Sequence, residues 1–250
     1  MDNRNIVITG ASSGFGKACA EILAKENHHL ILCARREARL TELATTLAKK
    51  CSVSTYCFDV RSEEETKQAA LAIGSNHGNI HVLINNAGLA LGKSNLKDGD
   101  TADWNQMIDT NLKGLLWMTK YCYPFMDKTG NGTIINIGSI AGKEVYPGGN
   151  VYCASKHAVD AITKAMRQDF LEDKIRVSQI APGAAETEFS LVRFKGDTEK
   201  ANNVYTGYKP LQAEDIAKCA EFILSLPNHV CINDMVVMPS QQANSTTFNT

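Results

Sequence analysis

The chain alternates between short apolar runs and longer stretches in which apolar residues recur with a helical period. The apolar runs are five to seven residues long and rich in Val, Ile and Leu, which is typical of strands buried on both faces. They cover residues 5–9, 29–34, 53–58, 80–84, 133–137, 175–180 and 232–238. Helical stretches separate them, up to about residue 25, over 37–50, from 62, over 101–127, and at about 150–172 and 213–225. This alternation predicts an α/β fold, a doubly wound parallel sheet of about seven strands with helices on both faces.

We expect a single domain over residues 1–250, because neither a repeat nor a linker divides the chain. Ser62 and Glu65 form a capping-box pattern that predicts a helix start, and Pro124 predicts an end or a kink in the tract before it. A segment at about 184–210 lacks a clear period and holds several basic and aromatic residues. Its length favours a substrate lid over an unstructured linker. The polar tail over 240–250 is expected to be loose unless it docks on a partner subunit.

The composition is typical of an ordinary soluble protein. The chain has 250 residues, a formal net charge of -1 and 44% hydrophobic residues. No basic stripe points to nucleic acid, and no apolar run approaches the ~20 residues of a membrane span. The first strand begins almost at once, so we expect no signal peptide. The eight cysteines form no Cys-x-x-Cys pair and no zinc-like spacing with histidine. These features predict a reduced, metal-free protein of the cytoplasm.

A glycine-rich turn follows the first strand and opens the next helix. It reads Gly10-Ala-Ser-Ser-Gly14-Phe-Gly16. Glycines let the backbone approach a phosphate, and the helix N-terminus supplies free N–H groups and a positive dipole end. The spacing differs from Gly-x-Gly-x-x-Gly and from a P-loop. The turn therefore predicts phosphate binding of another type, and a purely structural turn is the alternative.

The end of the second strand bears on the choice of cofactor. NAD sites usually place an acid there for the ribose 2′-hydroxyl, but this chain has Ala34, Arg35 and Arg36. Glu37 falls in the first turn of the next helix, where an acid complements the helix dipole. Guanidinium groups bind phosphate in bidentate fashion, so the two arginines favour the 2′-phosphate of NADP. The alternative is that both are solvated surface residues.

Several candidate groups follow the predicted strands directly. They are Gly10, residues 34–36, Asp59, residues 85–88 and Ser139. Ligands of doubly wound sheets bind beyond the carboxyl ends of the strands. We therefore expect these groups to converge at one edge of the sheet.

Ser139, Tyr152 and Lys156 form a candidate proton-handling group at that edge. Tyr152 and Lys156 are four residues apart, so on a helix they share one face. A hydroxyl that faces a phenol and an ammonium can polarise and protonate a carbonyl oxygen. The Lys156 cation is expected to lower the tyrosine pKa from its usual value near ~10. Taken alone, the pair also fits one face of an ordinary helix.

Together these motifs resemble the short-chain dehydrogenase/reductase family over essentially the whole chain. In the family's order and spacing, they are Thr9-Gly10-x-x-x-Gly14-x-Gly16, Asn85-Asn-Ala-Gly88, Asn111, Ser139, Tyr152-x-x-x-Lys156 and Pro182-Gly183. The resemblance implies a single Rossmann domain, an NAD(P) cofactor and usually a homotetramer.

The resemblance also implies a role for each motif. Tyr152 is the general acid–base and Ser139 positions the carbonyl oxygen. Lys156 holds the nicotinamide ribose and lowers the tyrosine pKa. Asn111 holds a water that relays protons, unless it is a helix-interior Asn that caps a kink. The implied cofactor-binding residues are Gly10, Ser12, Ser13, Gly14, Phe15, Gly16, Arg35, Arg36, Asp59, Val60, Asn86, Ala87, Gly88, Tyr152, Lys156, Pro182, Gly183 and Thr187.

Further segments resemble the bacterial NADP-dependent 3-hydroxy acid dehydrogenases, which act on serine, allo-threonine and related acids and reduce malonic semialdehyde. The segments are Asn86-Ala-Gly-Leu-Ala-Leu-Gly92, Met107-Ile-Asp-Thr-Asn-Leu-Lys-Gly114, Gly148-Gly-Asn-Val-Tyr152, Thr187-Glu-Phe-Ser, Val192-Arg-Phe-Lys-Gly-Asp197 and Leu226-Pro-Asn-His-Val-Cys-Ile-Asn-Asp234. Ala184-Ala-Glu and Cys153 depart from that pattern, and the first bears on the lid hinge.

The implied substrate is a small 3-hydroxy acid, such as serine, allo-threonine or 3-hydroxypropionate, oxidised at its 3-hydroxyl or formed from its 3-oxo counterpart. Substrate contacts then come from Ser139 and Tyr152, and the carboxylate needs a cation. Arg193 or Lys195 on the lid is predicted to bind it, and Arg offers the better bidentate geometry. Surface solvation is the alternative for each residue.

Two other functions stay open. A short-chain carbonyl reductase for a fatty acyl, sugar or other apolar ketone keeps the fold and changes the substrate. A non-catalytic cofactor-sensing protein is also compatible with this fold, although such proteins typically lack the tyrosine or lysine that this chain has.

Overall fold

The computed structural model describes residues 3–25 and 27–249. Its centre is a sheet in the order β3-β2-β1-β4-β5-β6-β7, in which every neighbouring pair is parallel. The strands are β1 (Arg4–Thr9), β2 (His28–Ala34), β3 (Ser52–Cys57), β4 (Val82–Asn85), β5 (Thr133–Ile137), β6 (Arg176–Pro182) and β7 (Asp234–Val237). Each lies within two residues of its predicted bounds. The predicted doubly wound parallel sheet is confirmed.

Alternate residues of the central strands face two separate cores. Ile6 pairs with Leu30, and both pack toward α1, α2 and α9. Val7 pairs with Ile31, and both pack toward α3, α5 and α6. All four side chains are fully buried. Burial on both faces explains why these strands are continuous apolar runs in the sequence.

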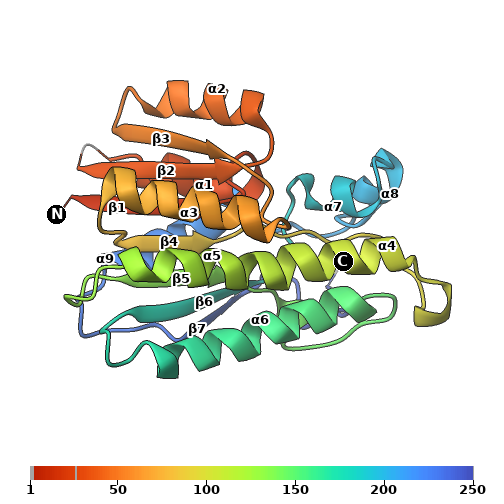
Figure 1. Ribbon diagram of the computed structural model, residues 1–250. Helices are drawn as coiled ribbons and strands as arrows, with labels where there is room; N and C mark the ends of the chain where they lie inside the picture. The colour runs from red at the N-terminus through yellow and green to blue at the C-terminus, as the bar shows by residue number, and fades with distance from the viewer. Residues whose placement is uncertain (1–2, 26, 250) are drawn as a thin grey trace.

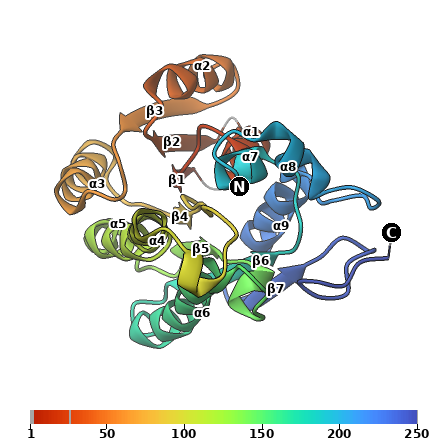
Figure 2. The same ribbon diagram turned by 90° about the vertical axis from the view of Figure 1, so that its right-hand side faces the viewer.

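Helices cover both faces of the sheet. They are α1 (Gly14–Leu23), α2 (Glu37–Leu47), α3 (Glu63–His77), α4 (Thr101–Ile108), α5 (Gly114–Cys122), α6 (Asn150–Asp169), α7 (Glu188–Arg193), α8 (Thr198–Asn203) and α9 (Ala213–Ser225). Figure 2 shows α3, α5 and α6 on one side of the sheet and α1 and α9 on the other. Figure 1 shows α7 and α8 beyond the ends of the strands rather than over either face.

The helical tract predicted over 101–127 is interrupted. Between α4 and α5 lies η2, a π-helical turn over Asp109–Lys113 that contains Asn111. After α5 the chain enters a 3-10 turn, η3 (Tyr123–Phe125), so the tract ends at Pro124 as predicted. At the start of α3, Ser62 accepts the N–H of Glu65 at 3.3 Å. The Glu65 carboxylate instead accepts the N–H of Asp59 at 3.0 Å, so the predicted capping box is only half formed.

The tail is folded rather than loose over 240–249. Gln242 and Phe248 form an antiparallel bridge, and the Phe248 ring lies 4.4 Å from that of Tyr208. The Gln242 side chain is buried and accepts the N–H of Ala184 at 2.8 Å. Gln241 accepts the N–H of Lys209 at 3.0 Å. The tail thus binds both ends of the 184–210 segment, which explains how so polar a stretch is ordered.

Three further features concern only residues 3–25 and 27–249. No helix in these ranges combines the length and apolar character needed to cross a bilayer. No group of three or more His, Cys, Asp or Glu side chains there is arranged to hold a metal ion. The eight cysteines are all free thiols.

Candidate active site

A cavity of about 790 Å³ lies at the carboxyl ends of the strands, as expected for a sheet whose strand order reverses between β1 and β4. Most of the predicted site residues line it. They are Gly10, Ser12, Ser13, Gly14, Phe15, Arg35, Arg36, Val60, Asn86, Ala87, Gly88, Ser139, Tyr152, Lys156, Pro182, Gly183, Thr187 and Arg193. The predicted residues outside its lining are Gly16, Asp59, Asn111 and Lys195.

The glycine turn packs closely against the residues that follow β4. Gly10 has φ +66, and a Cβ there would lie 3.0 Å from the Cα of Ala87. Gly16 packs the start of α1 against the turn, because a Cβ at this position would lie 2.5 Å from the Gly10 carbonyl oxygen. Asn86 braces the same turn by donating to the Thr9 carbonyl at 2.9 Å. The missing side chain at Gly16 therefore lets the start of α1 pack closely against the turn.

The corner beyond β2 gathers cationic and hydroxyl donors. Arg36 Nη2 lies 2.6 Å from Ser13 Oγ and 3.2 Å from Ser12 Oγ. Ala34 also lines the cavity, in the place where an acid would hold a ribose 2′-hydroxyl. Asp59 lies to one side and accepts Arg61 at 2.6 and 2.9 Å. Burial raises the pKa of Asp59, but the hydrogen bonds from Arg61 outweigh it and hold the pKa below its usual value.

Ser139, Tyr152 and Lys156 meet at the cavity, as predicted. Tyr152 and Lys156 are buried on α6, one turn apart, and Ser139 lies close enough to the Tyr152 phenol to affect its pKa. Lys156 Nζ donates to the Ile137 carbonyl at 2.9 Å. The Ser139 hydroxyl also caps the following 3-10 turn, η4 (Ile140–Gly142), by accepting the N–H of Ala141 at 3.1 Å.

The electrostatics of this group differ from the expectation. Burial raises the pKa of Tyr152 above its usual value, and neighbouring Tyr146 raises it further. The Ser139 side chain and the Arg193 cation oppose that rise without reversing it. Burial also lowers the pKa of Lys156 to about 8. In the protein without cofactor, loss of water around both groups outweighs the attraction that was expected to lower the tyrosine pKa.

Asn111 braces the site from the π-helical turn. Its amide accepts the N–H of Leu89 at 2.8 Å and donates to the Leu89 carbonyl at 2.8 Å and to Ser155 Oγ at 3.0 Å. Both amide hydrogens are therefore used, and the side chain joins the loop that follows β4 to α6 beside Lys156. A proton-relaying water at Asn111 stays a prediction.

The two candidate cations on the 184–210 segment lie in different surroundings. Arg193 donates to the Gly92 carbonyl at 3.1 Å and to Tyr146 Oη at 3.0 Å, and its guanidinium lies 5.8 Å from the Tyr152 ring centroid. Its Nη2 is buried and has no hydrogen-bond partner among the described residues. Lys195 is 57% exposed and pairs with Asp103 at 2.9 Å and Asp100 at 3.5 Å. Arg193, and not Lys195, lies beside the tyrosine.

Comparison with known proteins agrees with this geometry. The family model described as short chain dehydrogenase matches residues 4–197. The chain belongs to the short chain dehydrogenase family.

Individual relatives match nearly the whole chain. It is 45% identical to a sulfoacetaldehyde reductase 2 of Chromohalobacter salexigens, over 95% of each chain. It is 42% identical to an NADP-dependent 3-hydroxy acid dehydrogenase of Schizosaccharomyces pombe, over 98% of this chain and 96% of that one. Among solved structures, the closed form of a serine dehydrogenase complexed with NADP+ superposes with a TM-score of 0.91 at 38% identity, over 98% of each chain.

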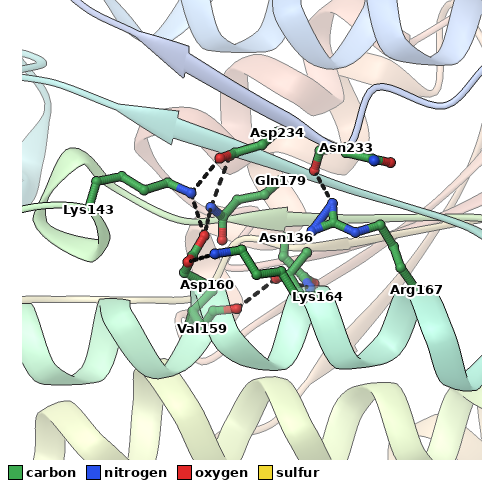
Figure 3. Close-up of polar contacts among 10 residues, drawn as sticks. Asn136, Lys143, Val159, Asp160, Lys164, Arg167, Gln179, Asn233 and Asp234 are labelled. Atoms are coloured by element: carbon green, nitrogen blue, oxygen red, sulfur yellow. Dashed lines mark hydrogen bonds and ion pairs between the residues drawn. The ribbon is translucent and has the colours of Figure 1, made fainter.

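Tyr152 and Lys156 lie on one helix, α6, and a network of charges fixes the turn beside it. Figure 3 shows Lys143 between Asp160 of α6 and Asp234 of β7, with Gln179 donating to both carboxylates at 2.9 and 3.1 Å. Burial raises the pKa of Asp160, but hydrogen bonds from Lys143, Lys164 and Gln179 lower it to about 2. Because Lys143 directly follows η4, this network fixes the Ser139 turn against the helix of Tyr152.

Several cavity residues were not predicted from the sequence. They are Tyr146, Glu188, Phe189, Gln242, Ser245, Thr246 and Phe248, among others. Tyr146 is the partner of Arg193, and Phe189 lies 5.6 Å from the Tyr152 ring. Both are aromatic residues close in sequence to predicted site residues, which is the one signal that pointed to them. The tail residues carry no comparable signal, because a polar tail has the same pattern whether or not it folds back.

Proposed function

We propose that this protein is an NADP-dependent oxidoreductase of small 3-hydroxy acids and their 3-oxo counterparts, such as serine, allo-threonine and 3-hydroxypropionate or malonic semialdehyde. One observation carries the proposal: the Arg193 guanidinium lies beside Tyr152, with Nη2 buried and unpaired among the described residues. A buried guanidinium nitrogen without a partner is unfavourable. A substrate carboxylate bound there supplies the missing partner and places a carbonyl near Tyr152 and Ser139.

The residues of the cavity fit NADP. Gly10, Ser12, Ser13 and Gly14 of the turn line the cavity, where their backbone can approach a phosphate. Arg36, Ser12 and Ser13 present donors to a 2′-phosphate, and Ala34 offers no carboxylate to a 2′-hydroxyl. The relatives named for NADP support the same choice. NADPH, when bound, supplies the hydride.

The protein's own residues handle the proton and the orientation of the substrate. In reduction Tyr152 donates its phenolic proton to the carbonyl oxygen, and Ser139 donates a hydrogen bond to the same oxygen. The raised pKa of Tyr152 keeps the phenol protonated at neutral pH, which suits this direction. In oxidation Tyr152 accepts the proton through its phenolate, which Lys156 and Arg193 stabilise as neighbouring cations.

Sulfoacetaldehyde reduction is a second candidate activity. Two relatives of this name, at 45% and 42% identity, favour it. Sulfoacetaldehyde and malonic semialdehyde both place an aldehyde one methylene from an anionic group. A guanidinium at Arg193 can bind either anion, because both present oxygen atoms that accept two hydrogen bonds.

The assembly and surroundings follow from the family resemblance. We infer that the 184–210 segment acts as a lid on the cavity and that the protein works in the cytoplasm as a homotetramer. Light scattering of the purified protein tests the assembly, with the mass of four chains expected and the mass of one chain contradicting it.

Arg193→Ala and Lys195→Ala test the substrate assignment as a matched pair. Loss of a charged hydrogen bond removes about 1.5–3 kcal/mol, so Arg193→Ala should lower kcat/KM for malonic semialdehyde by about 10- to 100-fold. Activity on propanal, which lacks the anion, should fall far less. Lys195→Ala should leave both within about twofold, as expected for an exposed ion pair. Equal losses on both aldehydes in Arg193→Ala would contradict carboxylate binding by this residue.

A further inference from the structure

Glu188 binds the same arginine corner that a 2′-phosphate requires. It is the first residue of α7, on the 184–210 segment, and its carboxylate lies 2.9 Å from Arg36 Nη1 and 2.6 Å from Arg39 Nη1. The remaining nitrogens of Arg36 face Ser12 and Ser13 of the glycine turn. The Glu188 carboxylate therefore occupies some of the hydrogen-bond donors of this corner. The 2′-phosphate of the cofactor is proposed to use the same corner.

The two arginines at this corner carry too little positive charge to neutralise both the Glu188 carboxylate and a phosphate. Two guanidinium groups face one carboxylate, which leaves a net charge of about +1. A phosphate monoester brings about −1.5 to −2 at pH 7. With Glu188 in place the corner becomes negative once the phosphate arrives, whereas without it the two arginines nearly balance the phosphate. The Glu188 carboxylate therefore weakens phosphate binding, and the effect is larger the closer the carboxylate stays to the two arginines.

The ion pairs are open to exchange. The side chains of Arg36, Arg39 and Glu188 are 42%, 48% and 41% exposed. Exposed pairs are weakly held, so a dianion that accepts several of the same donors can displace the carboxylate.

We propose that Glu188 is a built-in anion that occupies the 2′-phosphate corner until cofactor displaces it, and so weakens the binding of NADPH but not of NADH. This inference rests on the proposed use of NADP. Glu188 is then a residue that sets cofactor specificity, acting against the phosphate rather than for it. Because α7 also carries Arg193, the exchange links cofactor binding to the segment that holds the substrate cation.

Glu188→Gln tests the proposal, with Glu186→Gln as the matched control. Glu186 is an exposed lid carboxylate two residues away that contacts Gln212 and lies outside the main cavity. Dissociation constants for NADPH and NADH are measured by nicotinamide fluorescence, and for adenosine 2′,5′-bisphosphate and AMP by calorimetry. Glu188→Gln should tighten both 2′-phosphate ligands about 3- to 10-fold, with NADH and AMP within twofold. Glu186→Gln should leave all four within twofold.

Two results would overturn the proposal. Unchanged binding of adenosine 2′,5′-bisphosphate in Glu188→Gln would mean that the carboxylate does not compete with the phosphate. Weaker binding would mean that Glu188 is a strap that helps to hold the cofactor. Failure of the proposed NADP use looks different, because the wild-type protein would then bind NADH as well as or better than NADPH. Thermal melts of each variant confirm that the comparison is made between folded proteins.

Discussion

Residues 139–156 and residues 184–210 face each other across the cavity and are held in opposite ways. In the first segment Tyr152 and Lys156 are buried, and the surrounding turn is fixed by Asn111, by Ser155 and by the Lys143 network. In the second, α7 and α8 each bury a single residue, and the ion pairs of Glu188 and Lys195 are about half exposed.

This difference separates chemistry from recognition. Proton transfer requires atoms held to a fraction of an ångström, which packing against the sheet provides. Entry and release of cofactor and substrate require a region that opens easily, and weakly buried segments do so. Tyr152, proposed to transfer the proton, lies on the first segment, whereas Arg193, proposed to bind the substrate anion, and Glu188, proposed to oppose the 2′-phosphate, lie on the second.

Tyr152→Phe tests the first segment and is expected to have the largest effect. The change removes the proton donor and keeps the ring that packs in the first segment. General acid–base catalysis contributes about 10²–10⁴-fold, so kcat should fall by about 1,000-fold while the dissociation constant of NADPH stays within a few fold. Single-turnover reduction of malonic semialdehyde measures the effect. A variant with near-normal turnover would show that Tyr152 is not the acid.

Lys156→Met tests whether the buried Lys156 cation of the first segment lowers the stability of the folded protein. Because burial lowers the pKa of Lys156 to about 8 from 10.5, the folded protein binds fewer protons than the unfolded chain between these values. Stability from this group therefore rises with pH from about 8 to 10.5, and the full penalty is present below pH 8. The variant should be inactive and, at pH 7, more stable by about 2 kcal/mol, after allowing for the lost hydrogen bond to Ile137.

Urea unfolding of wild type and variant at pH 7 and pH 10 measures that gain. The stability difference between them should shrink as the pH rises, because the wild-type penalty disappears. A variant that is less stable than wild type at pH 7 would show that the contacts of Lys156 outweigh its burial as a cation.

A matched pair of lysines compares the two segments most directly. Lys143 and Lys195 each bind two carboxylates, but Lys143 is 21% exposed and Lys195 57% exposed. Lys143→Met should destabilise the protein by about 1.5 kcal/mol, because it removes the cation that Asp160 and Asp234 share and leaves Asp160 with Lys164. It should also lower kcat several-fold through the Ser139 turn. Lys195→Met should change stability by less than about 0.5 kcal/mol. Equal losses of stability would remove the distinction between the two segments.

The fold was predictable because the two faces of the sheet are both buried. Each strand is then a continuous apolar run, and the run alone locates it, as at residues 133–137. The helical tract at 101–127 was predicted as a unit, but the π-helical turn inside it was not. That turn depends on the three tertiary hydrogen bonds of Asn111, which have no local signature.

The candidate site was predictable where motifs lie at strand ends, as with Ser139, Tyr152 and Arg36. It was not predictable at positions where a long side chain can reach more than one partner. Arg193 and Lys195 are two residues apart in one basic stretch, yet one faces Tyr152 and the other pairs with Asp103. The order of the tail likewise depends on Gln242 reaching Ala184, a contact between residues 58 positions apart.

We propose that the cavity reduces small aldehydes bearing an anionic group and uses NADPH to do so. The ratio of kcat/KM for malonic semialdehyde to kcat/KM for propanal, measured on the wild-type protein with NADPH and again with NADH, tests it most directly. We expect a ratio of about 10 to 100 with NADPH, since a charged hydrogen bond contributes about 1.5–3 kcal/mol, and much lower rates for both aldehydes with NADH. A ratio near one, or equal rates with the two cofactors, would contradict the claim.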